Sequence, residues 1–270
     1  MKTVVVTGAS SGIGHACAVY LASRGCRVFA VSRKPPPDTR AVTHVVMDVT
    51  SDASVEHAFA TIAAEAGRID AVVQSAGIGY AGAVEDTSVE EARAQFETNF
   101  FGALRVLRAA LPELRRTRGR LVHVSSLAGH IALPFQGLYS ASKFALEGMV
   151  EAMHHELHGS GVAVSLVAPG DFRTGFTDNR RIVAAAGRSS AYAEQFDRTL
   201  QVFIADELAA ADPGEVARVV HTALTSGRPA LRYLVGAPLQ RWAVVLKAIL
   251  PWRVFSAVLR AIYKIRKPPR

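Results

Sequence analysis

The amino-acid sequence predicts an α/β fold: a single doubly wound parallel sheet with helices on both faces, followed by a C-terminal amphipathic helical tail. Three observations carry this prediction. Apolar runs without polar alternation recur between segments of helical periodicity, which is typical of parallel β-α-β units buried on both sheet faces. The first run leads into a glycine-rich turn and a helix. The last segment, from Arg241 on, combines an apolar helical stripe with basic side chains.

Length and composition agree with a globular chain. The 270 residues are 50% hydrophobic and 20% charged, which excludes a disordered or collagen-like protein. The chain has two cysteines, so we expect neither a disulfide scaffold nor a metal site. The short apolar run at the start and the lack of an uncharged apolar stretch of ~18 residues predict a cytoplasmic protein, with membrane association left open.

The elements of the first half follow in order. A β-branched run at 2–7 predicts a strand, and helical spacing at 13–24 predicts a helix that ends at Gly25. Apolar runs predict strands at 26–31 and at 42–47, the second ending at Asp48. Helical spacing resumes at 55–66, and a further strand is expected at 69–74.

The second half continues the alternation. A long helix at 90–111 is expected to end near Pro112, because proline interrupts helices. Strands at 120–125 and 162–168 flank a helix at 139–158, and a last helix is expected at 216–226. We therefore expect one domain at 1–240, with a substrate-side segment of loops and helices at 171–211, and a tail at 241–270. In such sheets ligands bind beyond the carboxyl ends of the strands.

The turn after the first strand is the first functional signal. It contains Gly8, Ser10, Ser11, Gly12, Ile13 and Gly14. Glycines let backbone N–H groups approach a ligand closely, and the following helix N-terminus favours an anion such as a pyrophosphate. This Gly-x-x-x-Gly-x-Gly turn resembles the cofactor turn of the short-chain dehydrogenases/reductases, and the likeness covers about residues 1–230. The resemblance implies a Rossmann-type fold that binds a nicotinamide dinucleotide.

The residues at the end of the second predicted strand indicate whether the cofactor is NAD or NADP(H). An acid there commonly binds the ribose hydroxyl of NAD, whereas an arginine suits the 2′-phosphate of NADP. The chain has Ser32, Arg33 and Lys34 at this place and no acid, which predicts NADP(H). The resemblance assigns further cofactor contacts to Asp48, Val49, Ser75, Ala76, Gly77, Pro169, Gly170 and Thr174. Ser75 departs from the family pattern, which usually has asparagine.

Tyr139 and Lys143 form the candidate catalytic pair. They are four residues apart and share one face of the predicted helix. A free tyrosine has a pKa of ~10, and a neighbouring ammonium lowers the pKa and makes the phenol a tuned acid–base group. Ser126 and Asn99 match the family's catalytic serine and helix asparagine. The resemblance implies hydride transfer to a carbonyl, with Tyr139 donating the proton, Ser126 orienting the substrate oxygen and Asn99 joining a proton relay. It also implies that Lys143 holds the ribose hydroxyls of the nicotinamide and that Tyr139 and Lys143 both contact the cofactor.

Substrate and partners are less defined. The stretch before Tyr139 looks like the estradiol-type 17β-hydroxysteroid and retinol dehydrogenase branch, which handles lipophilic alcohols and ketones. Candidate pocket residues are Ile131, Leu133, Phe135 and Phe176, with ordinary core packing as the alternative. The family often forms dimers or tetramers, so a homodimer or homotetramer is expected. Outside the eight basic residues at 241–270 the basic and acidic side chains balance, which argues against a nucleic-acid partner.

The tail leaves three alternatives open. From Pro251 on, Trp252, Phe255, Val258 and Leu259 follow helical spacing, with basic residues on the opposite side. Such a helix suits an anionic membrane surface, a cover over the pocket or a subunit contact. For the whole chain, the alternatives to an oxidoreductase of hydrophobic ketones, aldehydes and alcohols are an NADP(H)-binding sensor or scaffold without turnover and a C=C reductase of the same fold.

Overall fold

A seven-stranded parallel sheet forms the centre of the protein. The computed structural model describes residues 1–38, 40–175 and 179–266. The strand order is β3-β2-β1-β4-β6-β7-β9, and every neighbouring pair is parallel. This order confirms the predicted doubly wound sheet. The strands are β1 (Thr3–Thr7), β2 (Arg27–Ser32), β3 (Thr43–Val46), β4 (Ala71–Gln74), β6 (Arg120–Val124), β7 (Ala163–Pro169) and β9 (Arg232–Val235).

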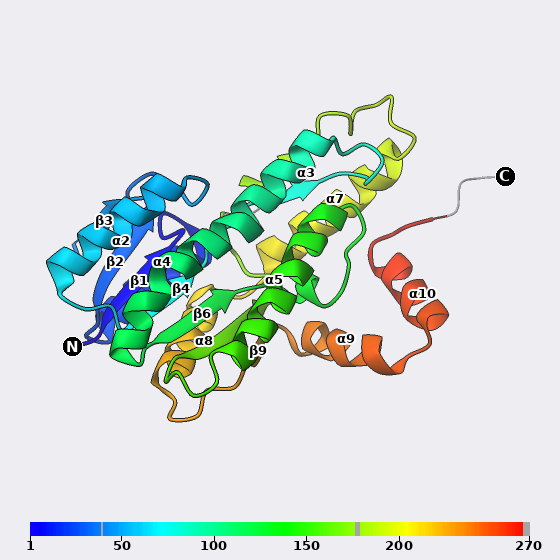
Figure 1. Ribbon diagram of the computed structural model, residues 1–270. Helices are drawn as coiled ribbons and strands as arrows, with labels where there is room; N and C mark the ends of the chain where they lie inside the picture. Colours follow the sequence, from blue (N-terminus) through cyan, green and yellow to red (C-terminus); the bar gives the residue numbers. More distant parts are fainter. Residues whose placement is uncertain (39, 176–178, 267–270) are drawn as a thin grey trace.

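Helices cover both faces of the sheet (Figure 1). On one face lie α1 (Gly12–Ser23) and α8 (Gly214–Thr225), and on the other lie α2 (Asp52–Ala66), α4 (Gly102–Thr117) and α5 (Gly137–Glu156). Strand β1 shows why its sequence does not alternate. Val4 and Val6 pack toward α1 and α8, while Val5 packs toward the opposite helices, and all three are buried. The non-alternating runs thus reflect two buried faces.

The predicted helix at 90–111 is two helices in the structure. Helix α3 (Val89–Phe96) passes through a single π-helical turn (Glu97–Phe101) into α4. The predicted end near Pro112 is wrong, because α4 continues through Pro112 to Thr117. Pro112 is exposed, whereas Leu114 is fully buried in the core, so packing of the last turn outweighs the backbone hydrogen bond that the proline removes.

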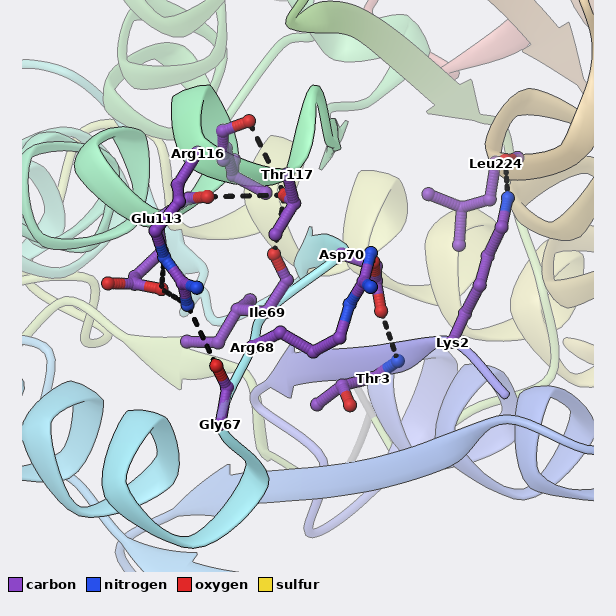
Figure 2. A network of polar contacts seen from close by, with 11 residues as sticks. Lys2, Thr3, Gly67, Arg68, Ile69, Asp70, Glu113, Arg116, Thr117 and Leu224 are labelled. Atoms are coloured by element: carbon purple, nitrogen blue, oxygen red, sulfur yellow. Dashed lines mark hydrogen bonds and ion pairs between the residues drawn. The ribbon is translucent and has the colours of Figure 1, made fainter.

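A polar network closes the amino-terminal edge of the sheet, opposite the edge where ligands are expected (Figure 2). The Asp70 carboxylate accepts a hydrogen bond from the Thr3 backbone N–H at 2.8 Å and pairs with Arg68. The Thr117 hydroxyl donates to the Ile69 carbonyl at 2.8 Å. These bonds join the start of β1, the end of α4 and the segment before β4, and they satisfy backbone groups that strand and helix ends leave unpaired.

The C-terminal part adds elements that the sequence did not predict as such. The substrate-side segment contains β8 (Arg181–Ile182), paired with β5 (Tyr80–Ala81), and α7 (Ala193–Ala209). After β9 the tail forms α9 (Pro238–Ile249) and α10 (Trp252–Ile262), drawn in orange and red at the side of the molecule (Figure 1). This confirms the helical tail. Within the described residues, no helix is long and apolar enough to cross a membrane.

Candidate active site

The glycine-rich turn lies between β1 and α1, at the carboxyl edge of the sheet. Gly8 has a φ of 66°, and a Cβ on it would lie 2.8 Å from the Cα of Ala76. A Cβ on Gly14 would lie 2.3 Å from the carbonyl oxygen of Gly8. Both positions therefore require glycine, because a side chain at either would collide with backbone. Because these positions carry no side chain, a ligand can closely approach the backbone N–H groups of the turn.

The first turn of α1 fits an anionic ligand. Its N-cap, Ser11, makes no side-chain capping bond and the turn carries no acid, as far as the described residues go. The backbone N–H groups at this end of the helix have no intrahelical partner, and the helix dipole favours negative charge there. Ser10 and Ile13 lie in the same turn, half-buried. The turn thus offers what the pyrophosphate of a nicotinamide dinucleotide requires.

Ser32, Arg33 and Asp48 lie together at the ends of β2 and β3. The Ser32 hydroxyl is buried and donates to the Lys34 carbonyl at 2.6 Å, whereas the Arg33 side chain is exposed. The Asp48 carboxylate accepts hydrogen bonds from the backbone and hydroxyl of Thr50. Burial raises the pKa of Asp48, but these bonds and the charges of Arg33 and Arg105 outweigh burial, so the net shift of the pKa is downward. Arg33 and Asp48 therefore share one corner of the site.

The loop after β4 joins the glycine-rich turn to the predicted catalytic residues. The Thr7 hydroxyl accepts hydrogen bonds from the backbone N–H groups of Ser75 and Ala76, both at 3.1 Å. A Cβ on Gly77 would lie 3.3 Å from Oδ1 of Asn99 and 3.9 Å from Nζ of Lys143. Val49, the other predicted contact here, is buried against Gly102. The structure therefore places the predicted cofactor contacts of this loop beside Asn99 and Lys143, two of the predicted catalytic residues.

Asn99 lies in the π-helical turn and is 2% exposed. Its side chain accepts a hydrogen bond from the Ile78 N–H at 2.8 Å and donates to the Ile78 carbonyl and to the Ser142 hydroxyl. The asparagine amide thus fastens the loop after β4 to α5. Single π-helical turns inside α-helices frequently occur at functional sites. The sequence indicated the residue but not this local geometry.

Ser126, Tyr139 and Lys143 converge from two elements. Ser126 follows β6, and the other two residues lie on the first turns of α5. The Ser126 hydroxyl is hydrogen-bonded to the Tyr139 side chain and also caps the Ala128 N–H. Nζ of Lys143 lies 5.8 Å from the centre of the Tyr139 ring and donates to the Val124 carbonyl. All three side chains therefore face the same space, which a proton donor beside a bound carbonyl requires.

The pKa values of the pair differ from the expectation drawn from the sequence. Burial raises the pKa of Tyr139 to about 12; the Ser126 hydrogen bond opposes this shift, and the carboxylates of Glu207 and Asp171 add to it. Burial also lowers the pKa of Lys143 to about 8, against the opposing effect of Glu147. The pKa shift of Tyr139 is thus opposite to the predicted lowering, because desolvation of the phenolate is the largest effect and the cation charge that opposes it is that of Arg180.

The loop after β7 completes the cofactor side. Pro169 ends β7, and its carbonyl lies 3.5 Å from the Ser126 hydroxyl. The Gly170 N–H donates to the Val235 carbonyl at 2.8 Å. The Thr174 side chain lies 3.4 Å from the position that a Cβ on Gly12 would take. These three predicted contacts therefore lie between the glycine turn and Ser126, the predicted catalytic serine.

The predicted substrate residues do not line one common pocket in the described part of the chain. Ile131 is buried in the body and Leu133 is half-buried beside α5. Phe135, which has a φ of 57°, packs on Phe196 of α7 and lines an open cavity of about 480 Å³ together with Ile265 of the tail. Phe176 lies outside the described residues. A second cavity, of about 650 Å³, is lined by α3 and the π-helical turn, away from Tyr139.

Asp171 is a site residue that the sequence reasoning missed. Its carboxylate accepts a hydrogen bond from the Gln240 amide of α9 at 2.5 Å. Burial and the charges of Glu207 and Asp206 raise the pKa of Asp171 to about 6. Glu207 is buried and paired with Arg180, and the Asp171 and Glu207 charges both act on Tyr139. The sequence signal for this residue was its place: an acid directly after Pro169 and Gly170, where a strand ends at the edge of the sheet that binds ligands.

We expect Asp171→Asn to stabilise the protein at pH 8. The folded-state pKa lies about two units above the ordinary value, so the ionised carboxylate costs on the order of 2–3 kcal/mol above pH 6. This cost falls as the pH is lowered through 6 and is mostly gone at pH 4, because the folded protein takes up the proton there and the unfolded-state pKa is ~3.9. Urea unfolding of both proteins at the two pH values measures the difference.

The matched control is Asp38→Asn, because Arg40 lowers the pKa of that exposed carboxyl to about 2. This variant should gain no stability at pH 8. An Asp171→Asn variant with equal gains at pH 8 and pH 4 would contradict the assignment of the cost to ionisation.

Comparisons with known proteins agree with this geometry. Residues 2–183 match the family model described as short chain dehydrogenase. The chain is 39% identical over 266 residues to the 3-ketodihydrosphingosine reductase of Bacteroides thetaiotaomicron, covering 98% of this chain and 99% of the relative. A short-chain dehydrogenase of Streptomyces avermitilis has a similar structure, with a TM-score of 0.81, 29% identity and 98% of both chains covered.

Two further solved structures hold nicotinamide cofactors. A short-chain dehydrogenase/reductase of Burkholderia phymatum in complex with NAD matches with a TM-score of 0.78 and 25% identity, over 92% of both chains. A variant of the actinorhodin polyketide ketoreductase with NADPH matches with a TM-score of 0.71 and 28% identity, over 87% of this chain and 95% of the other. The glycine turn, the Ser126–Tyr139–Lys143 group and these matches together show that the chain belongs to the short-chain dehydrogenase family of oxidoreductases.

Proposed function

We propose that the protein is an NADP(H)-dependent oxidoreductase that interconverts a hydrophobic ketone or aldehyde with the corresponding alcohol. The observation that carries this proposal is the meeting of Ser126, Tyr139 and Lys143 beside the glycine turn. NADP(H) supplies the hydride when bound. Ser126 orients the substrate oxygen, Tyr139 transfers the proton to or from that oxygen, and Lys143 holds positive charge near the phenol.

The direction we propose is carbonyl reduction. A Tyr139 pKa of about 12 keeps the phenol protonated at neutral pH, which is the state that a proton donor needs. The surrounding carboxylates of Asp171 and Glu207 favour the protonated phenol further, because they oppose a second negative charge nearby. Oxidation would require Tyr139 to give up its proton before it accepts one from the alcohol.

The choice of NADP(H) is supported by charge at the end of β2. Arg33 and Lys34 are both exposed there, and the described segment from Val31 to Lys34 has no acid to bind the ribose hydroxyl of NAD. Arg33 also lies close enough to Asp48 to influence its pKa, so the cation is near the place where the adenosine would bind. The 2′-phosphate of NADP(H) would therefore lie near the guanidinium of Arg33, which can bind it.

Within hydrophobic carbonyls, we propose a long-chain ketone that carries an amine. The 39% identical relative is named a 3-ketodihydrosphingosine reductase, and that substrate has an amino group next to its ketone. The carboxylate of Asp171 lies close enough to Tyr139 to act on its pKa. An ammonium beside the reacting carbonyl would compensate this charge. Steroid and retinoid substrates, which the sequence likeness suggested, lack such a group.

The test is oxidation of NADPH and of NADH by the purified protein with 3-ketodihydrosphingosine, a steroid ketone and retinal. We expect NADPH oxidation that is fastest with the amino ketone. The Asp171→Asn variant should raise KM for this ketone at least tenfold and leave KM for a long-chain ketone without an amine unchanged.

Three outcomes would contradict the proposal in whole or in part. Tight NADPH binding without oxidation by any carbonyl would favour a sensor or scaffold. Loss of an alkene instead of a carbonyl in the product would favour a C=C reductase. Faster turnover of retinal or the steroid than of the amino ketone would keep the reaction but refute the amine.

A further inference from the structure

Helices α9 and α10 present apolar side chains to solvent. Between 239 and 262 eight large apolar residues are exposed, and we call this set the outer face. Its members are Leu239, Trp242, Val245, Ile249, Trp252, Val254, Val258 and Ile262. The chain has two tryptophans, and both belong to this face, with 62% and 66% of Trp242 and Trp252 exposed. Apolar patches of this kind on a surface mark an interaction site.

Helix α9 is oriented opposite to an ordinary surface helix. Two of its polar side chains face the body: the Gln240 amide donates to Asp171, and the Lys247 ammonium donates to the His130 carbonyl. Four large apolar residues of α9, at spacings of three and four, are exposed and include Trp242 and Ile249, whereas Val244 and Leu246 are half-buried. Packing on the body therefore does not explain the exposed apolar residues of α9.

Helix α10 is apolar on two sides. Phe255 is 3% exposed and faces the body, as does Tyr263 just beyond the helix, which packs on Phe203 and accepts a hydrogen bond from Thr199. Val254 and Val258 are exposed on a different side. The sequence placed Phe255 and Val258 in one stripe. In the structure Phe255 anchors the helix on the body, whereas Val258 is exposed, so packing on the body does not account for it.

The outer face is bordered by positive charge. Exposed basic residues of the tail are Arg241, Arg253, Arg260, Lys264 and Arg266. The sequence from 241 to 270 contains no aspartate or glutamate, so no acid of the tail offsets these charges. Apolar side chains with tryptophans, flanked by arginines and lysines, are the composition of helices that lie in the interface of an anionic bilayer.

We propose that the outer face of α9 and α10 docks on an anionic lipid membrane. The charges decide against a second copy of the chain, because two such faces brought together by a two-fold axis would place like charges next to one another. An anionic lipid surface attracts the same arginines and accepts tryptophan side chains at headgroup depth. Docking does not depend on the proposed reaction.

The inner sides of these helices connect the docked surface to the active site. Gln240 of α9 holds Asp171, and Ile265 beyond α10 lines the cavity of Phe135. A membrane under the outer face would thus lie one helix away from the substrate side (Figure 1). This placement suits a substrate that dissolves in the lipid, an inference that rests on the proposed function.

The experiment is sedimentation of the full chain with vesicles of phosphatidylcholine alone and with added phosphatidylglycerol. We expect binding to the anionic vesicles and a blue shift of tryptophan emission, since both tryptophans lie on the outer face. Trp242→Ser with Ile249→Ser should weaken binding at least tenfold, and so should Arg253→Glu with Arg260→Glu. Neither readout requires turnover.

The controls alter equally exposed residues elsewhere. Val46→Ser, at 65% exposure on β3, and Arg188→Glu with Arg218→Glu, with the same change in charge, should bind like the unchanged protein. Circular dichroism checks that every variant folds. The proposal is overturned by absence of binding to anionic vesicles, by equal binding to neutral ones, or by equal losses in the control variants. Self-association that the outer-face variants abolish, without vesicle binding, would assign the face to a second copy.

Discussion

Replacing Tyr139 by phenylalanine is expected to lower kcat for carbonyl reduction by 10²- to 10⁴-fold, the range that a general acid contributes. The substitution removes the hydroxyl that is hydrogen-bonded to Ser126 and retains the aromatic ring. The remaining Ser126 hydroxyl still orients the substrate oxygen, but no group at this place supplies the proton. Steady-state rates of NADPH oxidation with the best ketone measure the loss.

The matched control for this variant is Tyr20→Phe. Tyr20 lies on α1 and packs edge-on against His221, with the ring centres 5.8 Å apart, far along the helix from the glycine turn. This variant should retain full activity. NADPH titration of Tyr139→Phe should give an unchanged Kd, which separates loss of chemistry from loss of the site. Turnover within threefold of the unchanged protein would remove Tyr139 from the role of proton donor.

The sequence was sufficient for the fold and for the residue types of the site because both depend on local pattern. Strand β1, with Val4, Val5 and Val6 buried on two faces, is recognisable from its uninterrupted apolar run. The positive φ of Gly8 follows from the glycine-rich pattern of the first strand–helix turn. Such features are encoded within a few neighbouring residues, and the order of parallel crossovers follows from handedness.

The parts that the sequence did not predict depend on contacts between distant segments. Gln240 and Asp171 are 69 positions apart, and no periodicity links them. The pKa of Tyr139 depends on Glu207 and on desolvation of its hydroxyl, neither of which is visible beside Lys143 in the sequence. The helix through Pro112 continues because Leu114 reaches the core. Tertiary packing in these places outweighs local preference.

Removal of the Arg33 side chain is expected to change the cofactor preference. Arg33→Ala should raise KM for NADPH by about 10- to 100-fold, which corresponds to the 1.5–3 kcal/mol of one charged hydrogen bond, and should leave KM for NADH unchanged. The selectivity arises because the two cofactors differ by the 2′-phosphate alone, and Arg33 is exposed at the end of β2.

The control for Arg33 lies in the same part of the chain. Arg40 is also exposed but is paired with Asp38 at 2.9 Å, so Arg40→Ala should leave both KM values unchanged. Lowering the salt concentration should strengthen NADPH binding to the unchanged protein more than to Arg33→Ala, because an exposed ion pair is screened. Equal increases in KM for both cofactors would mean that Arg33 supports the loop rather than the phosphate. A preference of the unchanged protein for NADH would refute NADP(H) itself, since the two cations at this corner would then have no phosphate to bind.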